Sequence, residues 1–189
     1  MRRLPVRPWL LILFVLTVAI GLPIACGYIR LPGGWTVNFP GFGGDPIPDD
    51  QLQQRLHVPD GFSINSYAGG IGNARMLLFT PTGDLLVSSP RDGTVWLLER
   101  DADGDGVADG RRELIYNLYQ PHGLALHDGW LYVAETNAVL RVRFDPATRT
   151  VSGSPERIIT GLPDGGNHWT RTVHVGPDGK LYVSIGSSC

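Results

Sequence analysis

Short stretches in which apolar and polar residues alternate recur along this chain of 189 residues. Three of them share a longer pattern, in which a turn glycine and one further residue precede a leucine-x-valine triplet. The leucines that open the triplets, Leu85, Leu131 and Leu181, are 46 and 50 residues apart. Self-similarity with a period of roughly 40–50 residues is typical of strand-rich propeller blades. The pattern therefore predicts an all-β fold built from repeated small sheets.

The strands predicted from this alternation fall into groups of four. The first two groups are complete, the third contains two strands, and a single strand precedes the first group. About four to eight blades are needed to close a propeller, and an unclosed stack leaves sheet edges unpaired. We therefore expect the chain to be part of a longer protein, with a half-propeller that dimerises as the alternative. The predicted strands are 62–67, 75–79, 85–88, 94–99, 113–116, 123–126, 130–133, 139–144, 157–159, 171–175 and 181–185.

The N-terminus has the pattern of a targeting segment. Arg2, Arg3 and Arg7 precede a long apolar run, which is the arrangement of a positive n-region and an apolar h-region. One interpretation is a lipoprotein signal, because Ile24-Ala25-Cys26 resembles a lipobox and Cys26 would carry the lipid. The other is an uncleaved signal anchor whose arginines stay inside the cell; a buried core helix is the alternative to both. The first two interpretations predict a protein at the cell membrane that faces the periplasm or the exterior.

Composition divides the rest of the chain into a linker and a domain. Residues 27–57 are rich in glycine and proline and show no sustained period, so we interpret them as a linker. With the signal or anchor at 1–26, this leaves a partial propeller domain at 58–189. The formal net charge is −2, so the chain lacks the basic excess typical of nucleic-acid binding. The sequence contains no HExxH, CxxC, GxSxG or GxGxxG motif.

An acidic loop between the third and fourth strands of the first blade is a candidate metal site. Asp101, Asp103, Asp105 and Asp109 occupy positions 1, 3, 5 and 9 of the loop, and a glycine occupies position 6. This is the spacing of a calcium loop of the EF-hand type, in which oxygen atoms converge on one hard cation. Position 12, however, is Arg112 instead of a bidentate glutamate, and no helices flank the loop. A calcium site and a solvated acidic loop therefore both remain open.

Two histidines precede innermost strands, where loops line the axial mouth of a propeller. His168 follows Asn167 just before the innermost strand of the third blade. His122 and nearby Gln120 hold the matching place before the innermost strand of the second blade. Because histidine accepts a proton near neutral pH, this placement favours an axial site for chemistry or ligand binding. The alternative is that these are ordinary polar loop residues.

Four segments together resemble the pyrroloquinoline-quinone-dependent sugar dehydrogenases, in particular their sorbosone dehydrogenase branch. The resemblance extends from about Pro59 to Cys189. Its most specific part is the Asn167-His168 segment followed by the Gly-Pro-Asp-Gly turn and the run Leu-Tyr-Val-Ser-Ile-Gly. The matching segments are 85–93, 101–109, 121–126 and 166–171.

The resemblance implies a six-bladed β-propeller that oxidises aldoses or related small sugars. Pyrroloquinoline quinone would lie over the axial mouth, with calcium helping to hold and polarise it. The resemblance also implies that His168 is the catalytic base, which takes the proton of the anomeric hydroxyl group. We expect Asn167, His122 and Gln120 to bind the substrate. The quinone-binding residues of the family are expected beyond Cys189, so we expect the present chain to be inactive alone.

Two other functions remain open at this point. A calcium-dependent lactonase on a propeller would need a carboxylate-rich axial metal site, whereas histidines and an asparagine occupy the visible positions. A non-catalytic propeller that binds ligands through its mouth is the second alternative. The electron acceptor of a dehydrogenase is not indicated by the sequence.

Overall fold

The computed structural model describes residues 28–30, 36–38, 48–165 and 167–186. The predicted signal or anchor at 1–26, including the lipidation candidate Cys26, and the terminal Cys189 lie outside these ranges. Within the described part, no helix combines the length and the apolarity needed to cross a membrane. The chain divides into two compact units, Met1–Pro48 and Asp49–Cys189. In the first unit, β1 (Tyr28–Arg30) and β2 (Thr36–Asn38) form an antiparallel pair.

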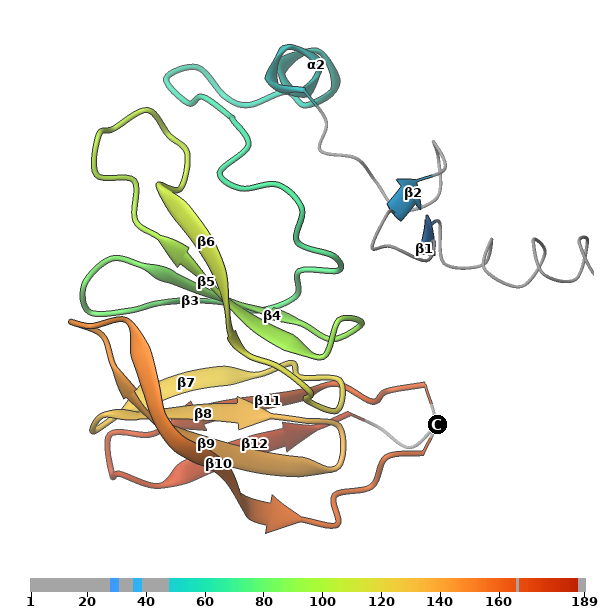
Figure 1. Cartoon of the computed structure of the whole chain (residues 1–189), viewed down its shortest axis with the longest axis vertical. Helices are drawn as coiled ribbons and strands as arrows, with labels where there is room; N and C mark the ends of the chain where they lie inside the picture. The colour runs from blue at the N-terminus through green and yellow to red at the C-terminus, as the bar shows by residue number, and fades with distance from the viewer. Residues whose placement is uncertain (1–27, 31–35, 39–47, 166, 187–189) are drawn as a thin grey trace, which may run out of the picture. The chain divides into compact units, whose positions relative to one another are not determined.

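The second unit begins with the short helix α2 (Asp49–Arg55) and continues as antiparallel sheets (Figure 1). Two sheets have four strands each and the third has two, and the strands of each sheet are paired in chain order. We call these sheets the first, second and third blades. The first blade contains β3 (Leu77–Phe79), β4 (Leu85–Ser89), β5 (Thr94–Glu99) and β6 (Gly110–Ile115); the second contains β7 (Leu124–His127), β8 (Trp130–Ala134), β9 (Ala138–Asp145) and β10 (Thr150–Thr160); the third contains β11 (Arg171–Val175) and β12 (Leu181–Ile185).

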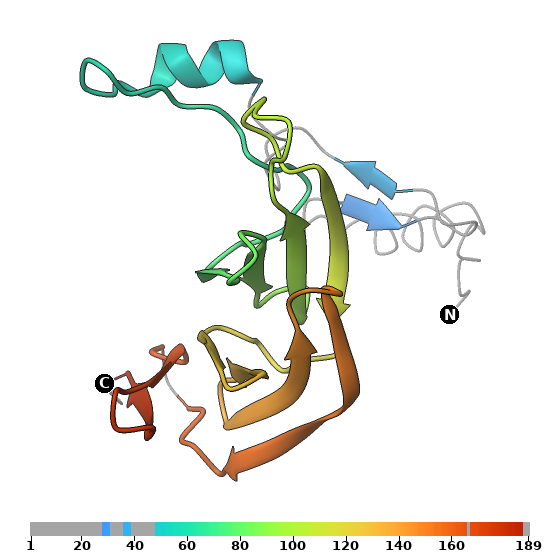
Figure 2. The ribbon, with the colours of Figure 1, turned by 90° about the vertical axis from the view of Figure 1, so that its left-hand side faces the viewer.

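The blades follow one another with their first strands on the same side of the unit. Figure 2 shows β3, β7 and β11 along one side and the fourth strands β6 and β10 along the other. The first strands of the second and third blades touch, because the Gly123 N–H donates to the Arg171 carbonyl at 2.9 Å. A Cβ atom on Gly123 would lie 2.7 Å from this carbonyl oxygen, so only glycine permits the approach. The arrangement confirms the predicted all-β, partial propeller.

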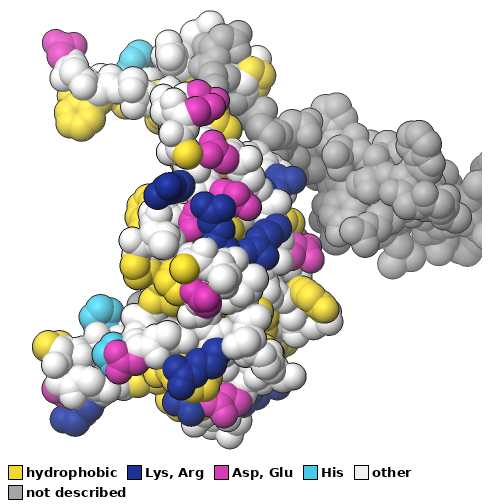
Figure 3. Space-filling model, turned by 60° about the vertical axis from the view of Figure 1, so that its left-hand side comes forward, with side chains coloured by type: hydrophobic (Ala, Val, Ile, Leu, Met, Phe, Trp, Pro, Cys, Tyr) yellow, Lys and Arg dark blue, Asp and Glu magenta, His cyan; other side chains and the backbone are white. Residues whose placement is uncertain are grey.

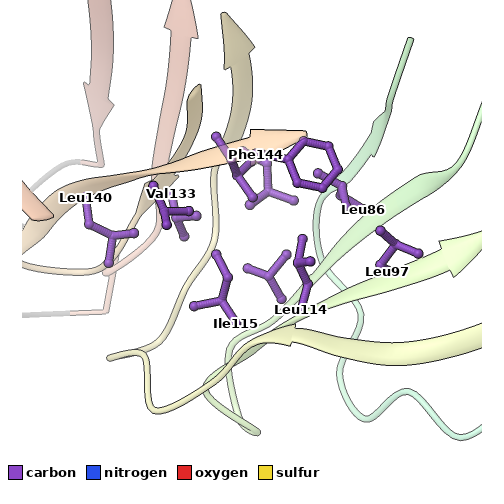
Figure 4. Packing of buried hydrophobic residues seen from close by; sticks show 11 residues of the cluster. Leu86, Leu97, Leu114, Ile115, Val133, Leu140 and Phe144 are labelled. Atoms are coloured by element: carbon purple, nitrogen blue, oxygen red, sulfur yellow. The ribbon is translucent and has the colours of Figure 1, made fainter. Parts of the chain in front are cut away.

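The main core lies between the first and second blades (Figure 4). Strand β8 shows how the alternation builds it, since Leu131 and Val133 face the first blade whereas Tyr132 and Ala134 belong to a second cluster against the third blade. Both faces of the second blade are therefore buried between neighbours, as expected for stacked blades. The main cluster consists of Leu86, Val95, Leu97, Leu114, Ile115, Leu124, Leu131, Val133, Leu140, Val142 and Phe144.

The predicted strand at 62–67 is wrong. The structure has no strand there, and Phe62 is 72% exposed. Alternating residues form a strand only where a partner edge accepts their backbone hydrogen bonds. Instead, Tyr67 and Ile71 pack against a buried cluster on the other face of the first blade, and the Tyr67 carbonyl accepts the N–H of Ala108 at 2.9 Å.

Helix α2 lies within the range that the sequence assigns to a linker. Its segment, Asp-Asp-Gln-Leu-Gln-Gln-Arg, contains neither glycine nor proline, although its neighbours on the N-terminal side are rich in both. Acidic residues at its start and Arg55 in its last turn suit the helix dipole.

A buried ion pair joins the first and second blades. Asp84 is fully buried in the turn between β3 and β4, and its Oδ2 lies 3.0 Å from Nε of Arg149, in the turn between β9 and β10. Arg149 also contacts Glu99 at 2.9 Å. Burial alone would raise the pKa of Asp84, but hydrogen bonds from the Arg100 N–H, Thr82 and Arg149 lower it overall.

On the face of the protein seen in Figure 3, basic and acidic side chains are interspersed.

Replacing Arg149 by methionine should destabilise the protein. The variant leaves the buried Asp84 carboxylate without its charged partner, which costs about 3 kcal/mol in the free energy of unfolding at neutral pH. Because the pKa of Asp84 is lowered on folding, its stabilising contribution is present at neutral pH and is lost as the pH falls through the folded pKa. Urea unfolding of the full-length protein should therefore show the difference between wild type and Arg149→Met shrinking in acid.

The control for Arg149→Met is Lys180→Met, which removes an exposed ion pair with Asp178. Such pairs contribute about 0.2–1 kcal/mol. Equal losses in the two variants, or a loss at Arg149 that persists unchanged in acid, would contradict the role given to Asp84.

Replacing Gly123 by alanine should also destabilise the protein. The new methyl group would lie too close to backbone atoms of β11, and these cannot move aside as the end of a flexible side chain can. Overpacking of this kind costs about 1–3 kcal/mol. Gly165→Ala is the matched control, since a Cβ atom there meets nothing within 4 Å. Thermal unfolding of the three proteins would compare them, and equal midpoints for all three would refute the tight approach of β7 to β11.

Candidate functional site at the lead-in loops

The three loops that lead into β3, β7 and β11, here called the lead-in loops, present comparable side chains. Arg75, His122 and Trp169 each lie two residues before the first strand of a blade, and they are 47 residues apart in both steps. The Arg75 N–H donates to the Ser88 carbonyl at 2.9 Å, and the His122 N–H donates to the Ala134 carbonyl at 2.8 Å. The blades therefore hold these side chains at equivalent positions on one edge.

His122 is the best-defined group of this site. It is half-buried, and its ring lies edge-on to Trp169 with the ring centroids 6.3 Å apart. Burial lowers its pKa, as does the charge of Arg75, whereas a hydrogen bond to the Arg171 carbonyl partly offsets the shift. His122 is therefore neutral at neutral pH. Its Nδ1 lies 3.1 Å from that carbonyl oxygen, which can only accept, so Nδ1 carries the proton and Nε2 keeps the lone pair.

Gln120 lies on the same loop in a strained conformation. Its φ of 50° is in the left-handed region, which costs roughly 1–2 kcal/mol in a residue other than glycine. The Thr136 hydroxyl donates to its side-chain oxygen at 2.9 Å. Next to it, the Tyr119 N–H donates at 2.7 Å to the fully buried Glu135, which pairs with Arg157. Strain that surrounding contacts maintain is common at functional sites.

Asn167 and His168 are exposed on the lead-in loop of the third blade. The structure holds this loop close to the end of β12, because a Cβ atom on Gly186 would lie 2.7 Å from the Cβ atom of His168. Trp169, the next residue after His168, contacts His122 on the lead-in loop of the second blade. The two histidine loops singled out in the sequence therefore adjoin each other.

Three residues of this region were missed by the sequence analysis. Arg75 and Trp169 could have been found from the even spacing of 47 residues around His122. Arg171, which is buried, could have been found from strand alternation, because it shares a face with the buried Val173. Its guanidinium donates to the carbonyl groups of His168 and Thr170 at 2.9 Å and to that of Pro163.

The acidic loop brings three of its four predicted aspartates together. Carboxylate oxygens of Asp101, Asp103 and Asp109 lie within 4.8 Å of one another. Asp101 accepts the N–H groups of Gly106 at 2.8 Å and Gly104 at 2.6 Å, and these hydrogen bonds, that of Gly106 first, lower its pKa. Asp105 lies outside the group of three and accepts the Val107 N–H at 2.7 Å.

The acidic loop lies at the opposite end of the first blade from the lead-in loops. Consecutive strands of an antiparallel sheet reverse direction, so the loops that follow the first and third strands share one end and the lead-in loops occupy the other. The acidic loop follows the third strand, β5, as does the turn that carries Arg149 in the second blade. The structure therefore separates the candidate metal site from the two histidines.

Comparisons with solved structures support this fold. The calcium structure of the Trichoderma reesei member of carbohydrate-active enzyme family AA12 is 27% identical, with a TM-score of 0.61, and the match covers 70% of this chain and 34% of that one. The holo form of the PQQ domain of a pyranose dehydrogenase from Coprinopsis cinerea is 24% identical, also with a TM-score of 0.61, and the match covers 70% of this chain and 32% of that one; this second likeness shows the fold alone. The chain thus spans about a third of the length of these structures.

No curated protein matches the chain. The pattern of the TrAA12-like family, however, matches residues 56–189, which is well over half of the sequence and includes all three blades. The family expected from the sequence is thereby confirmed, and the chain belongs to the TrAA12-like family.

Proposed function

We propose that this chain supplies part of the axial site of a quinone-dependent sugar dehydrogenase. The observation that carries the proposal is the convergence of the lead-in loops, which places Trp169 against His122 and exposes His168 beside them in a chain of this family. The solved relative from Trichoderma reesei supports the substrate class, since it belongs to a family of carbohydrate-active enzymes. The proposed substrate is a small aldose or sorbosone-type sugar.

The residues of the lead-in loops fit pyrroloquinoline quinone, a flat molecule with several carboxylates. Arg75 is exposed, and its charge lowers the pKa of His122, whose ring in turn contacts that of Trp169. Arg75 would hold a carboxylate of the quinone, and we propose that other blades supply its remaining ligands and its calcium ion. When bound, the quinone would accept the hydride that leaves the sugar carbon.

His168 acts as the general base in this proposal. It is exposed at the loop, and it would take the proton of the anomeric hydroxyl group onto a ring nitrogen. His122 would accept a hydrogen bond from a second hydroxyl group at Nε2, because its Nδ1 proton is engaged by the Arg171 carbonyl. Asn167, adjacent to the base, would orient the sugar, and Gln120 would use its NH₂ group because its oxygen already accepts the Thr136 hydroxyl.

We propose that the enzyme is exported and tethered to the membrane by residues 1–26. The support is the order of the segment, with three arginines before an apolar run and Cys26 at its end. A lipid on Cys26 or an uncleaved anchor would both keep the site at the outer side of the membrane, where it would pass electrons to an acceptor.

Removal of the base should strongly slow sugar oxidation without unfolding the protein. In the full-length protein reconstituted with quinone and calcium, His168→Ala should lower kcat by about 10²–10⁴-fold, the usual contribution of a general base. His174→Ala is the matched control, since His174 is an exposed histidine on β11. Dye-linked oxidation of aldoses measures both. Activity near the wild-type level in His168→Ala would show that another group is the base.

The acidic loop is proposed as a structural calcium site, apart from the quinone. Calcium added to the metal-free full-length protein should bind and raise the thermal unfolding midpoint, because Asp101, Asp103 and Asp109 offer convergent oxygen ligands. Asp101→Asn should weaken binding, whereas Asp60→Asn, which alters an exposed aspartate elsewhere, should not. Calorimetric titration measures the affinity, and equal affinities in the two variants would rule the loop out as the site.

A further inference from the structure

Arg171, the first residue of β11, is unusual for a charged residue because it is buried. It is only 2% exposed, and among the described residues it forms no ion pair with a carboxylate. A buried guanidinium group loses its hydration, and a carboxylate partner normally offsets that loss. The hydrogen bonds of the guanidinium group must therefore offset the loss of hydration.

All the side-chain hydrogen bonds described for Arg171 go to the main chain of one loop. Nη1 donates to the carbonyl groups of His168 and Thr170 at 2.9 Å each, and Nη2 donates to that of Pro163. Its buried Nε has no acceptor within the described structure. An unsatisfied buried donor is unfavourable for stability. The planar guanidinium group thus holds the main chain of the loop around His168, although its unsatisfied Nε lowers the stability of the protein.

The main chain of Arg171 makes the corresponding contacts with the other histidine loop. Its carbonyl accepts the Gly123 N–H at 2.9 Å and faces Nδ1 of His122 at 3.1 Å. One residue therefore holds the backbone of the loop carrying His168 with its side chain and fixes the ring of His122 with its carbonyl.

We propose that Arg171 is the positioning residue of this site: its guanidinium fixes the loop that carries His168, and its carbonyl fixes the tautomer of His122. The geometric part of the proposal stands on the hydrogen bonds above, whereas its catalytic consequence rests on the proposed dehydrogenase function. Misplacement of a reacting group by about 1 Å costs on the order of 10²-fold in rate. Loss of the guanidinium should therefore reduce kcat to that extent while the affinity for quinone stays near the wild-type value.

The test compares Arg171→Met and Arg171→Lys with wild type in the full-length protein by NMR. In Arg171→Met, the backbone order parameters of residues 167–170 should fall from about 0.85 to below about 0.6. Arg171→Lys keeps the charge but loses the planar fork, so it should give intermediate values. The imidazole nitrogen shifts of His122 should keep the Nδ1–H tautomer in both variants, because the carbonyl of residue 171 remains. Damage to the whole blade would change the loop and the tautomer together.

Arg143→Met is the matched control, because Arg143 also donates to a main-chain carbonyl, that of Asp128 at 3.1 Å, but within the second blade. It should leave residues 167–170 unchanged. Unchanged order parameters in a folded Arg171→Met variant would overturn the proposal. If that variant does not fold, the wild-type protein decides: the Arg171 Nη protons should exchange slowly with water, and rapid exchange would overturn the proposal.

The order parameters need neither quinone nor sugar, so they separate this inference from the proposed function. A loop that loses order in a protein without dehydrogenase activity would refute the function and leave the positioning role of Arg171 intact. An active enzyme whose kcat is unaffected by Arg171→Met would refute the catalytic consequence of that role.

Discussion

The structure depends on the burial of sheets on both faces. A blade of short strands is too small to fold alone, and it becomes stable only when each face meets a neighbouring blade. In the second blade, odd and even positions of β8 belong to different clusters, one against the first blade and one against the third. This constraint fixes the stacking of the blades, and the stacking brings the lead-in loops to one end.

The same constraint explains why so much of the fold can be predicted from the sequence. Strands β5 and β11 were predicted at the bounds that the structure shows. The side chains of β5 are buried or partly buried on both faces, whereas in β11 the buried Arg171 and Val173 alternate with exposed residues. The segment 62–67 alternates equally well, yet it forms no strand. Alternation reports which side of a segment is apolar, but it does not report whether a partner edge is available.

For the site, the sequence identified the two histidine loops but not how they meet. The contact between His122 and Trp169 depends on how closely β7 approaches β11, and Gly123 sets that distance in three dimensions. The buried Arg171 escaped notice because a charged residue at the start of a strand is normally taken to be exposed. By contrast, the separation of Asp101 from the histidines could have been predicted, since counting strand reversals along the chain assigns each loop to an end.

The pairing of Asp84 with Arg149 lies at the end of the blades far from the lead-in loops, so the stabilising charges and the proposed chemistry occupy opposite ends of the same strands. Mutations that reshape one end need not disturb the other. Substitutions in the lead-in loops can therefore change the proposed site while the ion pair that joins neighbouring blades stays in place.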